Sequence, residues 1–523
     1  MVDSFFSKPS KKRSGGRQSR QQSKPAAASK RSRPESDEEI SGSDSEDEDV
    51  SMEDVEETGS QDEDEEHADE TAADKRRRLA KQYLENLQHE EELGGFDAAD
   101  LDRDIIARRL KEDVAEEQGK VYKFIADKLN LSMVSPQDKT VKTHQLNAYG
   151  LTGVAVKFPF AYTVSKDLQL VKWDVSKPLK PRRTKFVRGR KKEDSGHNDE
   201  ITCVAVSPDG KYVVTGGKDK KIVVWSAENL APVRVFDTRD RKGVVTGLAF
   251  RRGTNELYAS CADLKVRTYN LDQLAQVEIL FGHQDEVQDI SALGQERCVT
   301  VGSRDRTAII WKITEESRLT FRGGDTSASK KRRKVDDDDD EMANGSVKSY
   351  EPVVEGSIDC CSMIDDQLFV TGSDNGNISL WSTNKKKPVY VARECHGRDD
   401  PMTPAMASAE TDPNAVPSPE PQPRYITSIY AIPFSNVFFS GSWSGEIKIW
   451  QLDDDLRKFH QIGSVPGVKG IVNRITVQES GPRNKETYNL FAALSKEPRL
   501  GRWLKVKGGK NGLLTAVIET KRP

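Results

Sequence analysis

The chain has 523 residues, of which 35% are hydrophobic and 32% are charged, so apolar side chains are scarce for a globular protein of this length. The formal net charge of −4 is unevenly spread: residues 1–74 hold 10 basic and 22 acidic side chains, which leaves 71 basic and 63 acidic ones, a balance of +8, in the remainder. No run of 18 apolar residues occurs and the N-terminus lacks the apolar core of a signal peptide, which argues against a membrane span and a secretory leader. The basic body suits a polyanionic partner.

Blocks of like charge make up residues 1–73. Residues 8–33 contain ten Lys and Arg side chains and no acid, whereas residues 35–74 contain 21 Asp and Glu side chains and no base. Such blocks repel and cannot bury a core, so a disordered, basic-then-acidic tail is predicted. Three of its serines have an acid three residues further on, a pattern that suits an acid-directed kinase, and are candidate phosphorylation sites: Ser36, Ser43 and Ser45.

Residues 74–132 are predicted to form a charged helical region. Apolar side chains recur there at helical spacing, at Leu79, Tyr83, Leu84 and Leu87 and then, after two glycines, from Leu101 to Leu129. The other faces of these helices are charged, so the helices would either pack on the domain that follows or hold a partner.

From residue 138 to residue 520 the pattern changes to short strands separated by turns, and a repeat becomes visible. Seven segments end in an aromatic residue: Trp173, Trp225, Tyr269, Trp311, Trp381, Trp450 and Trp503. Their spacings are 52, 44, 42, 70, 69 and 53 residues, and the two long intervals contain low-complexity inserts at 324–350 and 397–423. Without the inserts the period is about forty residues, which is typical of WD40 repeats. An all-β fold, a seven-bladed WD40 β-propeller, is therefore predicted.

Polar residues recur at fixed distances before these aromatic residues. A turn residue, usually Asp, lies six positions before, a Thr or Ser ten positions before, and a His 28 or 29 positions before. In WD40 blades these groups form a buried hydrogen-bond chain with the Trp indole N–H. The predicted network comprises His144, Thr163, Asp167 and Trp173 in blade one; His197, Thr215, Asp219 and Trp225 in blade two; and His283, Asp305 and Trp311 in blade four, where Val301 takes the place of the hydroxyl.

A His–Asp–Thr set also resembles a nucleophile with its base. Here the set recurs with the repeat, so we interpret it as structural. His396 precedes Trp450 across an insert, and the turn residues of blades five to seven have diverged from Asp. The sequence shows no phosphate-binding loop, metal-ligand spacing or nucleophile elbow. No enzyme activity, cofactor or metal is predicted, and the six Cys, which lack a CxxC pair, are expected to be buried thiols in a reduced compartment.

Both inserts are expected to follow the fourth strand of a blade and to lie in loops between blades, on the face that carries the turns between second and third strands. Such loops tolerate insertion because closure entropy grows slowly with length. The first insert contains five consecutive basic residues, a candidate nuclear import signal: Lys330, Lys331, Arg332, Arg333 and Lys334. The string KPSKKR at 8–13 is a rival signal.

Residues 177–192, KPLKPRRTKFVRGRKK, hold nine Lys and Arg, no acid and one Phe. Candidate RNA-binding residues in this patch are Lys180, Arg182, Arg183, Lys185, Arg188, Arg190, Lys191 and Lys192. A second group precedes the turn positions and is expected to be exposed on one rim: Lys166, Lys218, Arg304, Trp443 and Lys496. The alternatives are a charged outer strand that resists aggregation for the first group, and ordinary solvated turn residues for the second.

Four strings closely resemble the family of WD-repeat proteins specific to the U3 small nucleolar ribonucleoprotein (snoRNP): FGHQDEVQDI at 281–290, GSRDRTAIIWKI at 302–313, GSIDCC at 356–361 and LGRWLKV at 500–506. The resemblance covers roughly 75–520. It implies a non-catalytic RNA-binding scaffold in the nucleolus that binds the box B/C region of U3 snoRNA with a kink-turn-binding protein. It further implies contacts with other box C/D snoRNP and small-subunit processome proteins, and a role in producing 18S rRNA. No membrane and no small-molecule substrate is implied.

The alternative is a propeller adaptor in another nuclear complex, such as a chromatin complex or a ubiquitin ligase receptor. Ligase-receptor propellers often carry Trp-Asp-x-Arg, whereas Trp173 and Asp174 are followed by Val175 and Ser176. A histone-binding propeller is expected to have an acidic pocket, whereas the rim predicted here is basic.

Overall fold

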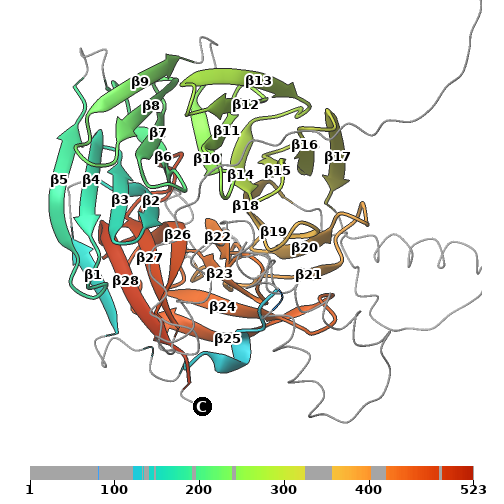
Figure 1. The fold of residues 1–523 in the computed structure, drawn as a ribbon. Helices are drawn as coiled ribbons and strands as arrows, with labels where there is room; N and C mark the ends of the chain where they lie inside the picture. Colours follow the sequence, from blue (N-terminus) through green and yellow to red (C-terminus); the bar gives the residue numbers. More distant parts are fainter. Residues whose placement is uncertain are drawn as a thin grey trace, which may run out of the picture. The chain divides into compact units, whose positions relative to one another are not determined.

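The computed structural model describes residues 81, 122–131, 134, 140–145, 149–190, 196–237, 243–323, 356–401, 420–481 and 486–521. Within them the chain forms seven four-stranded antiparallel sheets, which are arranged around a central axis as the blades of a propeller (Figure 1). The first strands of successive blades contact one another around the ring, and the first strand of the last blade contacts that of the first. The predicted seven-bladed WD40 propeller is confirmed.

The first four blades follow one another along the chain. Blade one contains β2 (Leu151–Lys157), β3 (Phe160–Ser165), β4 (Gln169–Asp174) and β5 (Arg182–Arg188), and blade two contains β6 (Ile201–Val206), β7 (Tyr212–Gly217), β8 (Lys221–Ser226) and β9 (Pro232–Asp237). Blade three contains β10 (Val245–Phe250), β11 (Glu256–Cys261), β12 (Lys265–Asn270) and β13 (Ala275–Phe281), and blade four contains β14 (Val287–Ala292), β15 (Arg297–Gly302), β16 (Thr307–Lys312) and β17 (Ser317–Arg322).

The last three blades include both inserts and the closure of the ring. Blade five contains β18 (Ile358–Met363), β19 (Leu368–Ser373), β20 (Ile378–Ser382) and β21 (Tyr390–Ala392), and blade six contains β22 (Ser428–Ala431), β23 (Val437–Gly441), β24 (Glu446–Leu452) and β25 (Phe459–Pro466). Blade seven contains β26 (Ile471–Ser480), β27 (Thr487–Ser495), β28 (Gly512–Glu519) and β1 (Val141–Gln145). Each insert thus follows the fourth strand of a blade, as predicted.

Blade seven is built from both ends of the ring. Its strand order is β26-β27-β28-β1, and β1 pairs antiparallel with β28, with Val141 opposite Ala516. From the sequence, the strand at 513–520 and the strand before His144 are both candidates to complete this blade. The structure uses both, because β28 is its third strand and β1 its outermost strand.

Residues 122–131 pack on blades six and seven. They contain one short 3-10 helix, η1 (Ala126–Lys128). The side-chain oxygen of Asn436 accepts the backbone N–H groups of Ile125 and Ala126 at 2.9 and 3.2 Å, and Ile125 is buried among side chains of both blades.

The prediction of helix up to residue 132 is therefore wrong for this described part, because contacts with the ring override the helical spacing of its apolar residues. Lys81 is helical, and the remainder of 74–121 lies outside the described residues, as does the tail at 1–73. No helix in the part of the chain that the structure describes is long and apolar enough to cross a membrane. All six cysteines are buried free thiols, as expected.

The hydrogen-bond network of blade two is complete. The ring nitrogens of His197 lie 3.0 Å from Asp219 Oδ2 and 2.7 Å from Thr215 Oγ1, and the indole N–H of Trp225 donates to the same hydroxyl oxygen at 2.7 Å. Burial alone would raise the pKa of Asp219, but hydrogen bonds from His197 and from two backbone N–H groups hold it below its ordinary value. Each buried polar atom in this chain of contacts thus finds a partner.

Blade four has a complete network as well, which corrects the prediction that it lacks a hydroxyl. Thr300 Oγ1 lies 2.7 Å from His283 Nε2 and accepts the indole N–H of Trp311 at 2.7 Å, while His283 Nδ1 lies 2.9 Å from Asp305 Oδ2. Four residues lie between the end of β15 and the start of β16, whereas three lie between the corresponding strands β7 and β8 of blade two. Thr300 is therefore eleven residues before Trp311 and not ten. The fixed spacing of ten therefore pointed to Val301.

Two members of the predicted repeat lie elsewhere. His144 belongs to β1 in blade seven, where its Nε2 lies 3.3 Å from Thr515 Oγ1, so blade one has only the bond from Trp173 to Thr163 at 2.9 Å and the contact of Ser165 with Asp167. Trp503 is not a strand residue: it lies in the loop between β27 and β28 and is 59% exposed.

Blade six keeps the network without an acid. His396 Nδ1 lies 2.7 Å from Ser444 Oγ, His396 Nε2 lies 2.8 Å from Ser440 Oγ, and the indole N–H of Trp450 donates to Ser440 Oγ at 2.8 Å. Burial and the nearby cations Lys448 and Arg424 lower the pKa of His396 to about 3, so this histidine is neutral at physiological pH.

We expect Thr300→Val to destabilise the propeller by about 2–4 kcal/mol, because the isosteric side chain leaves His283 Nε2 and Trp311 Nε1 buried without a partner. Thr320→Val is the matched control, since Thr320 is exposed on β17 of the same blade and its replacement should change stability by less than about 0.5 kcal/mol. Urea denaturation midpoints measure both. Equal midpoints for the two variants would contradict the role given to Thr300.

Candidate RNA-binding strand and central cavity

The basic patch forms the outermost strand of blade one. β5 pairs with β4 on one edge and ends the sheet on the other, and six of its seven residues are exposed. The candidates that the structure describes here are all exposed: Lys180, Arg182, Arg183, Lys185, Arg188 and Arg190. Lys191 and Lys192 lie outside the described residues. The structure therefore gathers the described candidates along one solvent-facing strand and the loops beside it.

The charges on β5 are available to a ligand. Across the described residues, no carboxylate lies within ion-pair distance of Arg182, Arg183, Lys185 or Arg188. Phe186 is 50% exposed beside them, and the Arg183 guanidinium lies 4.9 Å from the centre of its ring. Cations next to an exposed ring can bind phosphates and stack on a base.

The predicted rim of RNA-binding residues does not assemble. Lys166 is buried, not exposed, because the β27–β28 loop folds over it and its Nζ donates to the carbonyl oxygens of Pro498 and Gly501 at 2.7 and 2.9 Å. Burial lowers the pKa of Lys166. Lys218 is bound to Glu200, with Nζ 2.6 Å from Oε2.

The other three rim candidates differ in their surroundings. The indole N–H of Trp443 donates to Asp399 at 2.7 Å, whereas Arg304 and Lys496 are exposed. The expectation that Lys166 is exposed is therefore wrong, and Lys218 is paired with an acid. Both effects come from loop contacts that the repeat spacing does not reveal.

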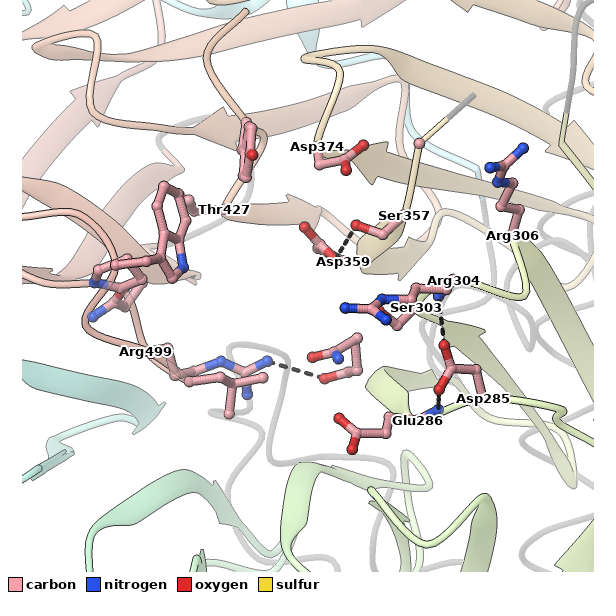
Figure 2. Close-up of a pocket in the computed structure, with 18 residues that line it drawn as sticks. Asp285, Glu286, Ser303, Arg304, Arg306, Ser357, Asp359, Asp374, Thr427 and Arg499 are labelled. Carbon is pink, nitrogen blue, oxygen red and sulfur yellow. Dashed lines mark hydrogen bonds between the residues drawn. The ribbon is translucent and has the colours of Figure 1, made fainter. Parts of the chain in front are cut away.

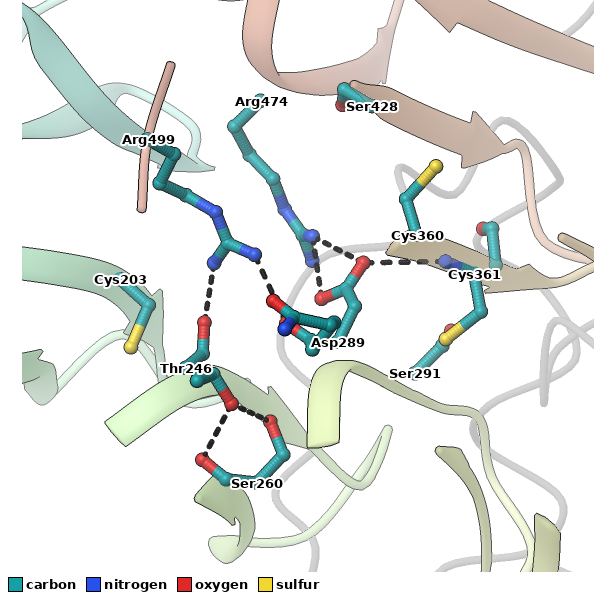
Figure 3. Close-up of polar contacts among 12 residues, drawn as sticks. Cys203, Thr246, Ser260, Asp289, Ser291, Cys360, Cys361, Ser428, Arg474 and Arg499 are labelled. Atoms are coloured by element: carbon teal, nitrogen blue, oxygen red, sulfur yellow. Dashed lines mark hydrogen bonds and ion pairs between the residues drawn. The ribbon is translucent and has the colours of Figure 1, made fainter. Parts of the chain in front are cut away.

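Two arginines of blade seven cross the central channel (Figure 3). Arg474 Nη1 on β26 lies 2.9 Å from both carboxylate oxygens of Asp289 on β14, and Asp289 is 1% exposed. The nearby carboxylate raises the pKa of Arg474. Arg499, from the β27–β28 loop, donates to the backbone oxygens of Thr246 in blade three and, at 3.0 Å, of Gln288 in β14 of blade four. These bonds join blades that are far apart in the ring.

A cavity of about 990 Å³ lies above Arg499, at the end of the channel that carries the turns between second and third strands. Its charged lining consists of four acids, Asp285, Glu286, Asp359 and Asp374, and three arginines, Arg304, Arg306 and Arg499. Figure 2 shows Asp359 and Asp374 facing the cavity from blade five. The sequence did not indicate a cluster of these acids, because they come from three separate segments: the loop before β14, the start of β18 and the turn between β19 and β20.

Within the described part of the chain, neither Asp359 nor Asp374 forms an ion pair. Asp359 accepts a hydrogen bond from the Ser357 hydroxyl at 3.0 Å, and Asp374 Oδ1 is buried without a hydrogen-bond partner among the described groups. Burial and the charge of Asp374 raise the pKa of Asp359 from 3.8 to about 6. Keeping both groups ionised therefore costs folding free energy at neutral pH.

Three aromatic rings stand beside these acids. The centroid of Tyr425 lies 5.1 Å from that of Trp503 and 5.6 Å from that of Trp443, and the two indoles are 5.9 Å apart. Tyr425 and Trp503 line the cavity. Burial, Asp374, Asp359 and Asp399 all raise the pKa of Tyr425, so its ring lies in the negative potential of the acids.

We expect Asp359→Asn to stabilise the protein most at neutral pH. The folded state binds the Asp359 proton more tightly than the unfolded state does. The free energy of unfolding of the wild type therefore falls as the pH rises from about 4 to about 6, and this loss stays constant above about pH 6. Over that window the variant should gain up to about 3 kcal/mol relative to the wild type. Urea midpoints across pH, with exposed Asp454→Asn as control, measure the difference. A gain that does not change with pH would contradict this assignment.

The comparisons with known proteins agree with the fold. The family described as WD domain, G-beta repeat matches residues 190–226, 274–312, 351–382 and 421–451. Ribosomal RNA-processing protein 9 of Saccharomyces cerevisiae is 46% identical over 93% of this chain and 96% of its own length. The human U3 small nucleolar RNA-interacting protein 2 is 33% identical over 85% of this chain and 82% of its own.

Solved structures give the same result. The structure of U3-55K covers 73% of this chain and 98% of its own, with 30% identity and a TM-score of 0.58, and the crystal structure of RRP9 WD40 repeats gives the same values. At this identity and coverage, the chain belongs to the family of ribosomal RNA-processing protein 9 and U3 small nucleolar RNA-interacting protein 2.

Proposed function

We propose that the protein is a component of the U3 snoRNP and acts in processing precursor rRNA to 18S rRNA. The observation that carries this proposal is the 46% identity, over 93% of the chain, to a ribosomal RNA-processing protein. As a WD40 member of this family the protein is a scaffold and not an enzyme. Its role is to hold RNA and proteins in a fixed arrangement.

We further propose that the protein binds the box B/C region of U3 snoRNA together with a kink-turn-binding protein. A folded RNA of this kind is read through its shape, its 2′-hydroxyls and its splayed bases more than through helical sequence. A rigid ring suits such a partner, because its surfaces keep their spacing when the RNA binds. Other box C/D snoRNP and small-subunit processome proteins would contact the remaining surfaces.

Exposed cations on β5 are the proposed phosphate contacts. Arg182, Arg183, Lys185 and Arg188 lie along one outer strand together with Thr184, Phe186 and Val187. None of the four cations forms an ion pair with a described carboxylate, although Asp174 acts on Arg182 at longer range. Contacts of this type fix the position of the RNA without reading its sequence. Specificity would then come from the shape of the RNA and from the protein already bound to it.

The proposed location is the nucleus and, within it, the nucleolus, where the assembly of U3 snoRNP and rRNA takes place. The candidate import signal at 330–334 and the candidate phosphorylation sites Ser36, Ser43 and Ser45 lie outside the described residues. The described chain leaves the ring after β17 at Gly323 and re-enters it at Gly356, so the import string is part of a connection between two blades.

We expect the triple variant Arg182→Ala, Arg183→Ala, Arg188→Ala to bind U3 box B/C RNA about 10–100-fold more weakly at moderate salt. The slope of its salt dependence should be shallower by up to about one for each phosphate that is no longer neutralised. The control, Lys385→Ala, Lys386→Ala, Lys387→Ala, removes three exposed charges from the β20–β21 loop. Fluorescence anisotropy over a salt series measures both. Unchanged affinity and slope in the arginine variant would remove β5 from the interface.

We expect U3 snoRNA to be the main RNA that co-purifies with the tagged full-length protein. Sequencing of that RNA separates the proposed function from that of an adaptor in a chromatin or ubiquitin ligase complex, which would bring no U3. An eluate without U3 enrichment over an untagged control would end the proposal.

A further inference from the structure

The carboxylates that line the central cavity are available to a cation that the described chain does not supply. None of Asp285, Glu286, Asp359 and Asp374 forms an ion pair in the ranges that the structure covers. Asp285 is occupied by the backbone N–H groups of Glu286 and Arg304, at 2.8 and 3.2 Å. The pair formed by Asp359 and Asp374 is not, since the only described donor to it is the Ser357 hydroxyl.

The nearest cation is committed elsewhere. Arg499 lies on the floor of the cavity, but its two terminal nitrogens donate to the backbone carbonyls of Thr246 and Gln288. Those bonds hold it across the channel, and it acts on Asp359 through its charge, without a hydrogen bond or ion pair to either acid. The buried Oδ1 of Asp374 remains without a hydrogen-bond partner among the described groups, which costs free energy.

Aromatic rings complete the wall beside the two acids. Tyr425 and Trp503 line the same cavity, with their ring centres 5.1 Å apart, and Trp503 is 59% exposed. A planar guanidinium can donate two hydrogen bonds to a carboxylate while its face stacks on an aromatic ring. A lysine ammonium satisfies the charge but lacks both the fork and the flat face.

From this arrangement we propose that the cavity binds one arginine side chain of a partner protein, with the guanidinium against Asp359 and Asp374 and stacked beside Tyr425 and Trp503. The volume of about 990 Å³ leaves room for the neighbouring backbone of an extended segment. The site lies in the channel mouth rather than on β5, and its existence does not depend on the proposed binding of U3 snoRNA.

The charge balance of the lining limits the occupant to one cation. Arg304 and Arg306 line the cavity from blade four and would repel a polybasic segment. The four acids would likewise repel the phosphates of an RNA strand. A single arginine between neutral or acidic residues fits both constraints.

The test measures binding of three short capped peptides to the full-length protein in the absence of RNA: Gly-Arg-Gly, Gly-Lys-Gly and Gly-citrulline-Gly. Citrulline has the shape of arginine without its charge. Isothermal titration and the fluorescence of Trp503 report binding. We expect the arginine peptide to bind, the lysine peptide to bind several-fold more weakly, and the citrulline peptide to bind at least about tenfold more weakly.

Variants of the lining should change this binding in opposite directions. The double variant Asp359→Asn, Asp374→Asn should weaken binding of the arginine peptide about tenfold or more, because both carboxylates are removed while their shape is kept. Arg304→Gln should strengthen it by about two- to fivefold, since a repelling charge is removed. The control, Asp454→Asn, Asp455→Asn, makes the same change in net charge at exposed positions and should leave binding unchanged.

Binding should also weaken as the pH falls below about 6, where Asp359 takes up its proton. The groups that face Asp359 are Ser357, Asp374 and Arg499. Thermal unfolding of each variant confirms that the ring is intact. A variant that loses binding because its fold is damaged would also show a lowered unfolding temperature. The stronger binding expected of Arg304→Gln cannot result from a damaged fold, so it reports on the site itself.

Two results would overturn the proposal: the citrulline peptide binding as tightly as the arginine peptide, or the Asp359 and Asp374 double variant binding the arginine peptide as tightly as the control variant does. The peptide assay contains no U3 RNA, so a negative result would reject the arginine site without bearing on the proposed binding of U3 snoRNA. Likewise, a failure to co-purify U3 would reject the proposed function without bearing on the arginine site.

Discussion

The pairing of β1 with β28 is the contact on which the rest of the structure depends. It joins residues near the start of the ring to residues at its end, so seven sheets that otherwise follow one another along the chain become a closed ring. In an open arrangement, β28 would expose an unpaired edge, and the first strands of blades one and seven would each lose the contact that they make with one another. Closure thereby fixes the relative positions of the β5 strand, the channel and the cavity.

The channel contacts add a second constraint across the ring. Arg474 and Arg499 extend from blade seven to blades three and four, and the ion pair with Asp289 is largely shielded from water. Buried ion pairs contribute little net stability when compared with apolar packing, but removing one partner leaves a costly charge behind. Their role is therefore better described as fixing one arrangement of the blades than as adding stability.

The parts of the fold that could be predicted from the sequence are those that repeat. Spacing between aromatic residues indicated the number of blades, and the recurring His, Thr and Asp indicated the network of blade two. The prediction failed where the repeat is irregular: a turn with one extra residue moved the hydroxyl to Thr300, and His144 serves a blade at the other end of the chain. Trp503 marked a seventh repeat but lies in a loop, because the last blade takes its outer strand from the start of the ring.

Sites formed between blades could not be predicted in the same way. The exposure of β5 followed from a local run of charge, and the structure confirms it. The cavity combines residues from blades four to seven, and no local pattern relates Asp359 to Trp503. A weaker signal was present in the channel, because Asp289 and Arg474 interrupt apolar runs in VQDISA and IVNRITV. A charge at an inward position of an inner strand needs a partner, and that partner lies across the ring.

The serine in the network of blade six shows what the repeat requires at this position. Ser444 is 2.7 Å from His396 Nδ1, as close as the carboxylates of blades two and four are to their histidines. The position thus requires a short polar side chain that can bond to an imidazole, and a negative charge is optional. A search for intact blades that requires Asp at this position will therefore miss blades such as blade six. A search that accepts any short side chain able to hydrogen-bond to the histidine will detect them.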